Sequence, residues 1–216
     1  MSSQVLVQLF NAANNPFRSR HPAVSFINVH MERLSQVFDG WNGYQTSLLR
    51  AIEPLTAEQL TWRVAEGRRS IGELTRHIAL GRITWFARMK GPGLERATGR
   101  VPRWYTDGDG SRHAVEKSVP ADDAVQLIEW LKLSWEPVQA VLDEWSVSDL
   151  EQTYRHRFAG TDYQVSRQWT VWRIMSHDMH HGGQIAMMLA IQGIEAFDLR
   201  ALGGHIIQPS LVPPDT

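Results

Sequence analysis

Three histidines lie within five residues near the C-terminal end of the chain, inside the stretch 168–192. At about 100° per residue, His177 and His181 fall one helical turn apart on the same inward stripe as Ile174. Two imidazoles at this spacing can reach one point beside the helix, which is a common way to bind a transition metal. His180 is rotated by about 100° from His181 and is the alternative ligand. The spacing favours the pair His177 and His181.

Two histidines hold a metal weakly, so a third ligand is expected from elsewhere in the chain. The residue after His177 is Asp178, whereas the zinc-protease helix requires a glutamate there, and that class of enzyme is not indicated. His77 is the candidate, because it lies on the apolar face of a helix that Ser70 begins with a capping box. From spacing alone two interpretations stay open: a metal site, or partly buried histidines with local hydrogen bonds.

The elements that must position these histidines are four long amphipathic helices. The predicted fold is all-α, a four-helix bundle, with a small β-hairpin before the fourth helix and a long irregular connection between the second and third. The predicted helices span residues 30–52, 70–90, 121–145 and 168–192, and the connection spans 91–119. One domain is expected over residues 30–216, after an N-terminal arm at 1–29 and with an irregular tail after about residue 194.

The composition narrows the classes of function. With 22 basic and 23 acidic residues among 216, the chain gives no electrostatic reason to bind nucleic acid. No apolar run approaches the roughly 20 residues of a membrane span, and the N-terminus is a poor signal peptide. The sequence has no cysteine, which suits a cytoplasmic location. Any metal must therefore use nitrogen and oxygen ligands, and any thiol chemistry needs a thiol from outside.

Two segments carry a resemblance to a known family. They are SIGELTRHIA at 70–79 and HDMHHGGQI at 177–185, in the expected order of elements. In these segments the chain resembles the DinB-like superfamily of metalloproteins, which includes bacillithiol S-transferases and thiol-dependent isomerases. The resemblance implies that His77, His177 and His181 bind one divalent metal, zinc or nickel, with water completing the shell. It also implies a homodimer.

The function implied is a metal-dependent transferase that activates a low-molecular-weight thiol for attack on a small electrophile. The alternatives are a metal-hydroxide hydrolase and a non-catalytic, metal-stabilised dimeric stress-related protein, whose site Asp178 or His180 would close as a fourth ligand. No catalytic residue is assigned. Gln184 is expected to hydrogen-bond a ligand, a bound water or a backbone carbonyl. Asp178 is expected to orient His77 or His181, or else to pair with Arg173 or Arg82.

Selection of the electrophile is expected to fall to the connection between the second and third helices. Trp104 and Tyr105 offer an apolar wall with one hydroxyl there. An arginine of the same connection would neutralise an anionic substrate; the alternative is that these are solvated loop charges. The candidates are Arg100, Arg103 and Arg112.

Overall fold

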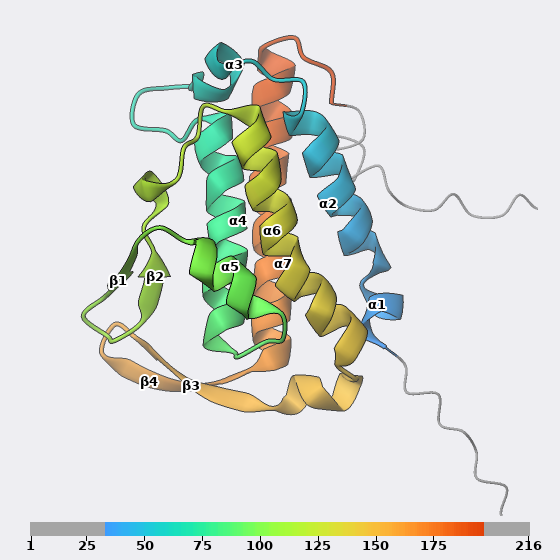
Figure 1. Cartoon of the computed structure of the whole chain (residues 1–216), viewed down its shortest axis with the longest axis vertical. Helices are drawn as coiled ribbons and strands as arrows, with labels where there is room; N and C mark the ends of the chain where they lie inside the picture. Colours follow the sequence, from blue (N-terminus) through green and yellow to red (C-terminus); the bar gives the residue numbers. More distant parts are fainter. Residues whose placement is uncertain (1–32, 197–216) are drawn as a thin grey trace, which may run out of the picture. The chain divides into compact units, whose positions relative to one another are not determined.

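Four long helices form the frame of the protein in a computed structural model, which describes residues 33–196. Helices α2 and α4 pack against the same two neighbours, because each of them contacts both α6 and α7. Figure 1 shows this arrangement, and the four helices are α2 (Asp39–Ile52), α4 (Ile71–Arg88), α6 (Ala124–Glu144) and α7 (Arg167–Ile191).

Capping side chains set where the helices begin. The Ser70 side chain accepts a hydrogen bond from the backbone N–H of Glu73, and the Glu73 carboxylate accepts one from the backbone of Ser70. This capping box opens α4 as predicted, and an equivalent box at Thr56 opens the short helix α3 (Ala57–Thr61). Ser166 caps α7, so the predicted start of the helix with the histidine pair is confirmed.

The first predicted helix is not continuous. Within the described residues it consists of α1 (Leu34–Val37) and α2, separated at Phe38, whose φ and ψ are −108° and 19°. The backbone N–H of Leu34 bonds to the carbonyl of Trp145, which fixes α1 to the end of α6. Gly40 also lowers helix propensity just after the break. The prediction of one helix over 30–52 is therefore wrong at this point.

The predicted irregular connection contains regular structure, so that prediction is wrong. Its elements are α5 (Leu94–Arg100), β1 (Trp104–Thr106), β2 (Arg112–Ala114) and the 3-10 helix η1 (Glu116–Ser118). The two strands pair antiparallel, with Trp104 opposite Ala114. Elements of three to seven residues are too short to show a period, but they bury apolar side chains in the core: Ala97, Val101, Ala114 and Val119.

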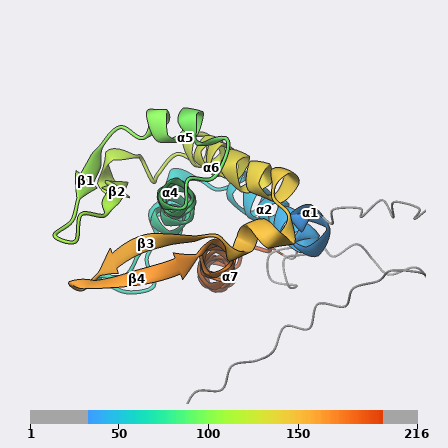
Figure 2. The ribbon, with the colours of Figure 1, turned by 90° about the horizontal axis from the view of Figure 1, so that it is seen from below.

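A second hairpin precedes α7 and confirms the predicted one. After the 3-10 helix η2 (Val147–Glu151), β3 (Thr153–Phe158) pairs antiparallel with β4 (Thr161–Ser166). The turn residues Ala159 and Gly160 both have positive φ, as a two-residue hairpin turn requires. The backbone N–H of Gly160 bonds to Asp109 at 2.9 Å. This bond links the two hairpins, and both lie on the α4 side of the helices, away from α2, as Figure 2 shows.

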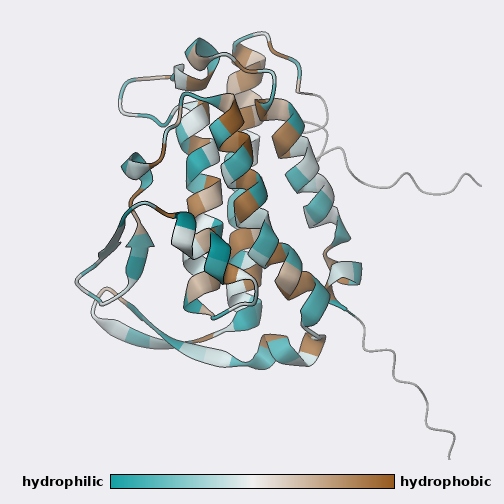
Figure 3. Cartoon of the chain, in the orientation of Figure 1, coloured by the Kyte–Doolittle hydropathy of each residue, from teal (hydrophilic) through white to brown (hydrophobic). Residues whose placement is uncertain are grey.

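Apolar stripes of the helices form the core, as predicted. The inward residues of α6 are all buried, and Figure 3 shows apolar and polar positions alternating along each long helix. The α6 stripe is Leu127, Leu131, Ser134, Val138, Val141 and Trp145. Among the helices of residues 33–196, none has the length and apolar character needed to cross a membrane. The predicted arm at 1–29 and the tail from residue 197 lie outside the described residues.

Candidate metal centre

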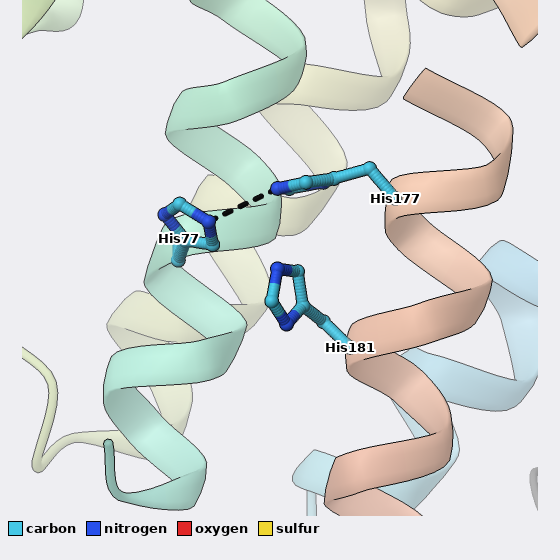
Figure 4. Close-up of side chains that lie close together, drawn as sticks. All are labelled: His77, His177 and His181. Carbon is cyan, nitrogen blue, oxygen red and sulfur yellow. Dashed lines mark hydrogen bonds between the residues drawn. The ribbon is translucent and has the colours of Figure 1, made fainter. Parts of the chain in front are cut away.

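The structure brings His77 of α4 together with His177 and His181 of α7 (Figure 4). The Nε2 atoms of His77 and His177 are 3.0 Å apart, and one nitrogen from each of the three rings lies within 4.8 Å of the others. Nitrogens bound to a tetrahedral ion at about 2.0–2.1 Å lie about 3.3 Å from one another. The cluster is thus near the size that one metal ion needs.

A glycine makes room for the ring of His177. Gly81 lies one turn beyond His77 on α4, and a Cβ atom at Gly81 would be 3.1 Å from Cε1 of His177. That distance is shorter than an ordinary van der Waals contact, so a side chain at residue 81 would displace the imidazole. Gly81, on the inward stripe of α4, therefore leaves the space that the His177 ring of α7 occupies.

Glu116 holds the His77 ring, although nothing in the sequence pointed to it. The Nδ1–H of His77 donates to Oε1 of Glu116 at 2.7 Å, and Arg69 donates to the same carboxylate at 2.6 Å. Burial raises the pKa of Glu116, but the hydrogen bonds from His77 and Arg69 outweigh it and lower that pKa to about 2. With Nδ1 protonated, the Nε2 lone pair of His77 faces the other two histidines.

Gln184 plays the same part for His181. The Nδ1–H of His181 donates to Oε1 of Gln184 at 2.8 Å, which leaves Nε2 unprotonated. Burial lowers the pKa of His181 to about 4, so the ring is neutral near pH 7 and available as a ligand. Gln184 thus bonds to a histidine in this structure, and its hydrogen bond to a ligand or a bound water stays a prediction. His180 is exposed and lies outside the cluster, with its Nε2 near Gln184 at 3.3 Å.

Two orphaned buried atoms beside His177 show that the cluster fits a metal. Because His77 carries its proton on Nδ1, the short contact between the two Nε2 atoms requires the proton on Nε2 of His177. Nδ1 of His177 is then a bare acceptor, and it is buried without a hydrogen-bond partner, as is Oδ1 of Asp178 at 3.7 Å from it. If His177 held a metal through Nε2, its proton would sit on Nδ1 and would face that carboxylate oxygen.

Asp178 makes its strong bonds away from the histidine cluster. It is completely buried, and Oδ2 accepts from Nε of Arg82 at 2.8 Å and from Nε1 of Trp41 at 2.9 Å. Asp178 is expected from the sequence to orient His77 or His181, or else to pair with Arg173 or Arg82, and the structure contains the ion pair with Arg82. Asp178 therefore holds α7 against α4 and α2, and it lies beside His177 rather than beside His77 or His181.

The Tyr44 hydroxyl contacts the backbone of α7 near the histidine pair, and this contact explains why residue 182 is glycine. The Tyr44 hydroxyl donates to the carbonyls of Asp178 and Met179 at 3.4 and 3.3 Å. A Cβ at Gly182 would lie 1.7 Å from the Tyr44 oxygen, so only glycine allows this approach. Burial raises the pKa of Tyr44 well above its usual value, which keeps the hydroxyl protonated as a donor.

A helix-rich fold with three inward histidines on two packed helices defines the class of protein. The family model of the DinB superfamily matches residues 43–185, and the chain belongs to this superfamily. No curated protein matches the chain.

Solved structures share the fold at low sequence identity. A DinB-like protein from Bacillus cereus ATCC 10987 is 17% identical with a TM-score of 0.56, over 77% of this chain and 97% of that one. A conserved protein from Enterococcus faecalis is 14% identical with a TM-score of 0.56, over 75% of this chain and 99% of that one. The helix-rich DinB-like fold is therefore shown.

The Glu116→Gln substitution should lower the free energy of unfolding at pH 7 by about 1–3 kcal/mol, since it weakens the hydrogen bonds that the charged carboxylate accepts from His77 and Arg69. The pKa of Glu116 is about 2 in the folded chain, below its usual 4.5. Its stabilisation is therefore present above pH 4.5 and is lost as the pH falls through 2. Urea unfolding at pH 7 and pH 3 should show a smaller difference between wild type and variant at pH 3.

The matched control for Glu116→Gln is Glu129→Gln, which changes an exposed carboxylate on α6. This control should alter stability by less than about 0.5 kcal/mol at either pH. A Glu116→Gln variant that behaves like Glu129→Gln would remove Glu116 as a partner of His77.

Proposed function

We propose that His77, His177 and His181 bind one divalent metal ion, zinc or nickel, within the predicted four-helix bundle of α2, α4, α6 and α7. The observation that carries the proposal is the hydrogen bonding of two of the three rings. His77 and His181 donate from Nδ1 to Glu116 and Gln184, which leaves Nε2 of both rings unprotonated. Three neutral imidazoles are ligands that suit both metals.

The ligand set supports a catalytic ion rather than a structural one. Among the described residues the cluster has three ligating side chains. Asp178 is occupied by Arg82 and Trp41, and His180 is exposed outside the group, so neither closes the site. The side chains of His77 and His177 are 25% and 24% exposed, which leaves the cluster open to a small molecule. Three protein ligands with a free position are typical of catalytic zinc.

The activity that we propose is transfer of a low-molecular-weight thiol to a small electrophile. A bound divalent ion would supply a Lewis acid that keeps a thiol ionised near neutral pH. The chain contributes orientation, because Glu116 and Gln184 fix the rings of His77 and His181. It has no cysteine, so the nucleophile must be brought in. The cytoplasmic location expected from the sequence belongs to this proposal.

A thiol-conjugation assay tests the activity. Untagged protein loaded with Zn²⁺ or Ni²⁺ is mixed with monobromobimane and each of several small thiols, and the rate is followed by fluorescence. The metal-loaded wild type should accelerate conjugation of at least one thiol, whereas chelated protein and the His77→Ala variant should not. Turnover that survives chelation would contradict the proposal. Ester hydrolysis by the metal-loaded protein without any thiol would favour the metal-hydroxide hydrolase.

We also propose the homodimer that the family resemblance implies, with α7 at its interface. Five large apolar side chains of α7 are exposed, namely Trp169, Trp172, Met179, Met187 and Ile191. An apolar stripe of this kind on a helix is typical of a surface that another protein covers. Light scattering at micromolar concentration should give about twice the chain mass of 24.6 kDa.

A charge placed in this stripe should separate the two copies. Met187→Asp should shift the mass to 24.6 kDa, because burying an unpaired carboxylate in an interface costs several kcal/mol. The control is Val125→Asp, an exposed apolar residue in the first turn of α6, which should leave the dimer intact. A wild-type mass of 24.6 kDa would remove the proposal.

A further inference from the structure

A cavity of about 790 Å³ lies between the β3–β4 hairpin and the neighbouring halves of α4 and α7. Its volume is that of a pocket for a small organic molecule. Aromatic and cationic side chains line it together, and those that matter here are Trp85, Trp169, Phe158, His156, Arg88 and Arg173. This cavity differs from the predicted substrate wall, since Trp104 and Tyr105 are not among its lining residues.

Two arginines lie against one tryptophan of this cavity. The guanidinium carbons of Arg88 and Arg173 are 4.4 and 4.7 Å from the centre of the Trp85 ring, and Arg173 is also 5.2 Å from the ring centre of Trp169. Stacking of this kind leaves the edge of a guanidinium free to donate hydrogen bonds. Arg88 already donates from Nη2 to Nδ1 of His113 at 3.1 Å and to the backbone carbonyl of Arg112 at 3.4 Å, whereas its Nε is buried and has no hydrogen-bond partner.

No carboxylate of the described chain neutralises these two arginines. Within residues 33–196, no acidic side chain lies within 4.0 Å of either guanidinium. Asp107 lines the cavity, but its carboxylate is taken by His113 at 2.6 Å and by the backbone N–H groups of Ser111 and Asp109. Asp107 keeps its negative charge in these hydrogen bonds, so Arg88 and Arg173 together leave the cavity with one cation in excess.

The positive charge of the two arginines also lowers the pKa of the neighbouring His156. Burial, Arg88 and Arg173 lower the pKa of His156, which packs edge-on against Trp85 with ring centres 5.2 Å apart. The third arginine of the lining, Arg157, lies 3.6 Å from each of two carboxylates, those of Asp109 and Asp162, and adds no further excess. A half-enclosed site of this charge favours an anion.

We infer that this cavity binds a small organic carboxylate, with its apolar body against Trp85 and Trp169 and its carboxylate on Arg88 and Arg173. The planar guanidinium matches a carboxylate, which it can bind with two parallel hydrogen bonds. The volume and the aromatic walls exceed the needs of an inorganic ion. Neither the three-histidine cluster nor the family match assigns a ligand to this place.

The cavity lies next to the candidate metal centre along the same two helices. Arg173 precedes His177 by one turn of α7, about 5.4 Å along the helix. Trp85 follows Gly81 by one turn of α4, and a Cβ at Gly81 would lie 3.1 Å from the His177 ring. The carboxylate is therefore a substrate of the proposed transferase, either the electrophile or the thiol. This part of the inference rests on the proposed function, whereas the binding itself does not.

Isothermal titration calorimetry on the metal-free full chain tests the inference with naphthoate as the probe. Wild type should bind naphthoate and should bind the neutral isostere naphthamide at least about tenfold more weakly, because a charge-assisted hydrogen bond is lost. Arg173→Gln and Arg88→Gln should each weaken naphthoate binding by about tenfold or more. Arg173 is exposed, so its variant keeps the fold even if Arg88→Gln does not.

The controls separate this site from the metal centre. Arg68→Gln, a change of an exposed arginine ahead of α4 and outside the cavity, should leave naphthoate binding unchanged, and so should His77→Ala. Equal affinity for acid and amide, or an unchanged affinity in Arg173→Gln, would overturn the inference. Inorganic phosphate binding as tightly as naphthoate would also overturn it. Loss of metal in His77→Ala with naphthoate binding intact would support both sites independently.

Discussion

Replacing His77 with alanine should lower the affinity for Zn²⁺ or Ni²⁺ by more than about a hundredfold, since even removal of a residue that only supports a ligand costs 10–100-fold. The substitution leaves two imidazoles of α7 and takes away the only ligand from α4 in the described cluster. Competition against a chromogenic chelator at pH 7 measures the affinity. Circular dichroism should show unchanged helix content, because His77 is only partly buried.

The control for this prediction is the neighbouring histidine. His180→Ala removes an exposed imidazole next to His181, and its affinity for the metal should remain within about threefold of wild type, which is about 0.7 kcal/mol. If His77→Ala keeps the metal, the ligand set proposed here is wrong. If His180→Ala loses the metal and His181→Ala keeps it, His180 replaces His181 as the ligand, which is the alternative from the sequence.

Replacing Asp178 with alanine should lower the free energy of unfolding by about 3–5 kcal/mol, the usual cost of breaking a buried ion pair. Arg82 and Asp178 both have side chains with no exposed area, so the guanidinium would stay buried without its counter-ion. Trp41 would also lose the acceptor of its ring N–H. Urea unfolding at pH 7, followed by circular dichroism, measures the effect.

Two comparison variants isolate the cause. Asp162→Ala breaks the exposed ion pair with Arg155 and should cost no more than about 1 kcal/mol. The double variant Arg82→Met with Asp178→Leu removes both charges and should be more stable than Asp178→Ala alone, because no unpaired charge stays buried. A loss in Asp178→Ala no larger than in Asp162→Ala would show that the pair does not anchor α7.

Local signals in the sequence predicted much of the fold and the shared face of His177 and His181, whereas the family resemblance implied that His77 joins them. A capping box depends on residues three apart, so Ser70 and Glu73 sufficed to place the start of α4. An i, i+4 pair depends only on helical periodicity, and His177 and His181 therefore share a face as predicted. The hairpin before α7 was predicted from alternation around a short turn, which is also local.

Contacts between distant segments escaped prediction for a physical reason. Glu116 reaches His77 across 39 residues, from a connection whose strands are three residues long and carry no periodic signal. Arg88 and Arg173 approach the same ring only because α4 and α7 pack together. Nothing in the local sequence distinguishes Asp178 from an exposed polar residue of a helix. Its burial depends on the ion pair with Arg82, which lies 96 residues away.

X-ray absorption spectroscopy of the protein loaded with Zn²⁺ or Ni²⁺ tests the metal centre most directly. For zinc, the spectrum should show three imidazole rings with nitrogen at about 2.0–2.1 Å, oxygen in the remaining position and no sulfur when no thiol is added. The His77→Ala sample, prepared in the same way, should hold far less metal, and any remaining ion should show at most two imidazoles. An unchanged imidazole count in His77→Ala, or a wild type that retains no metal, would contradict the account.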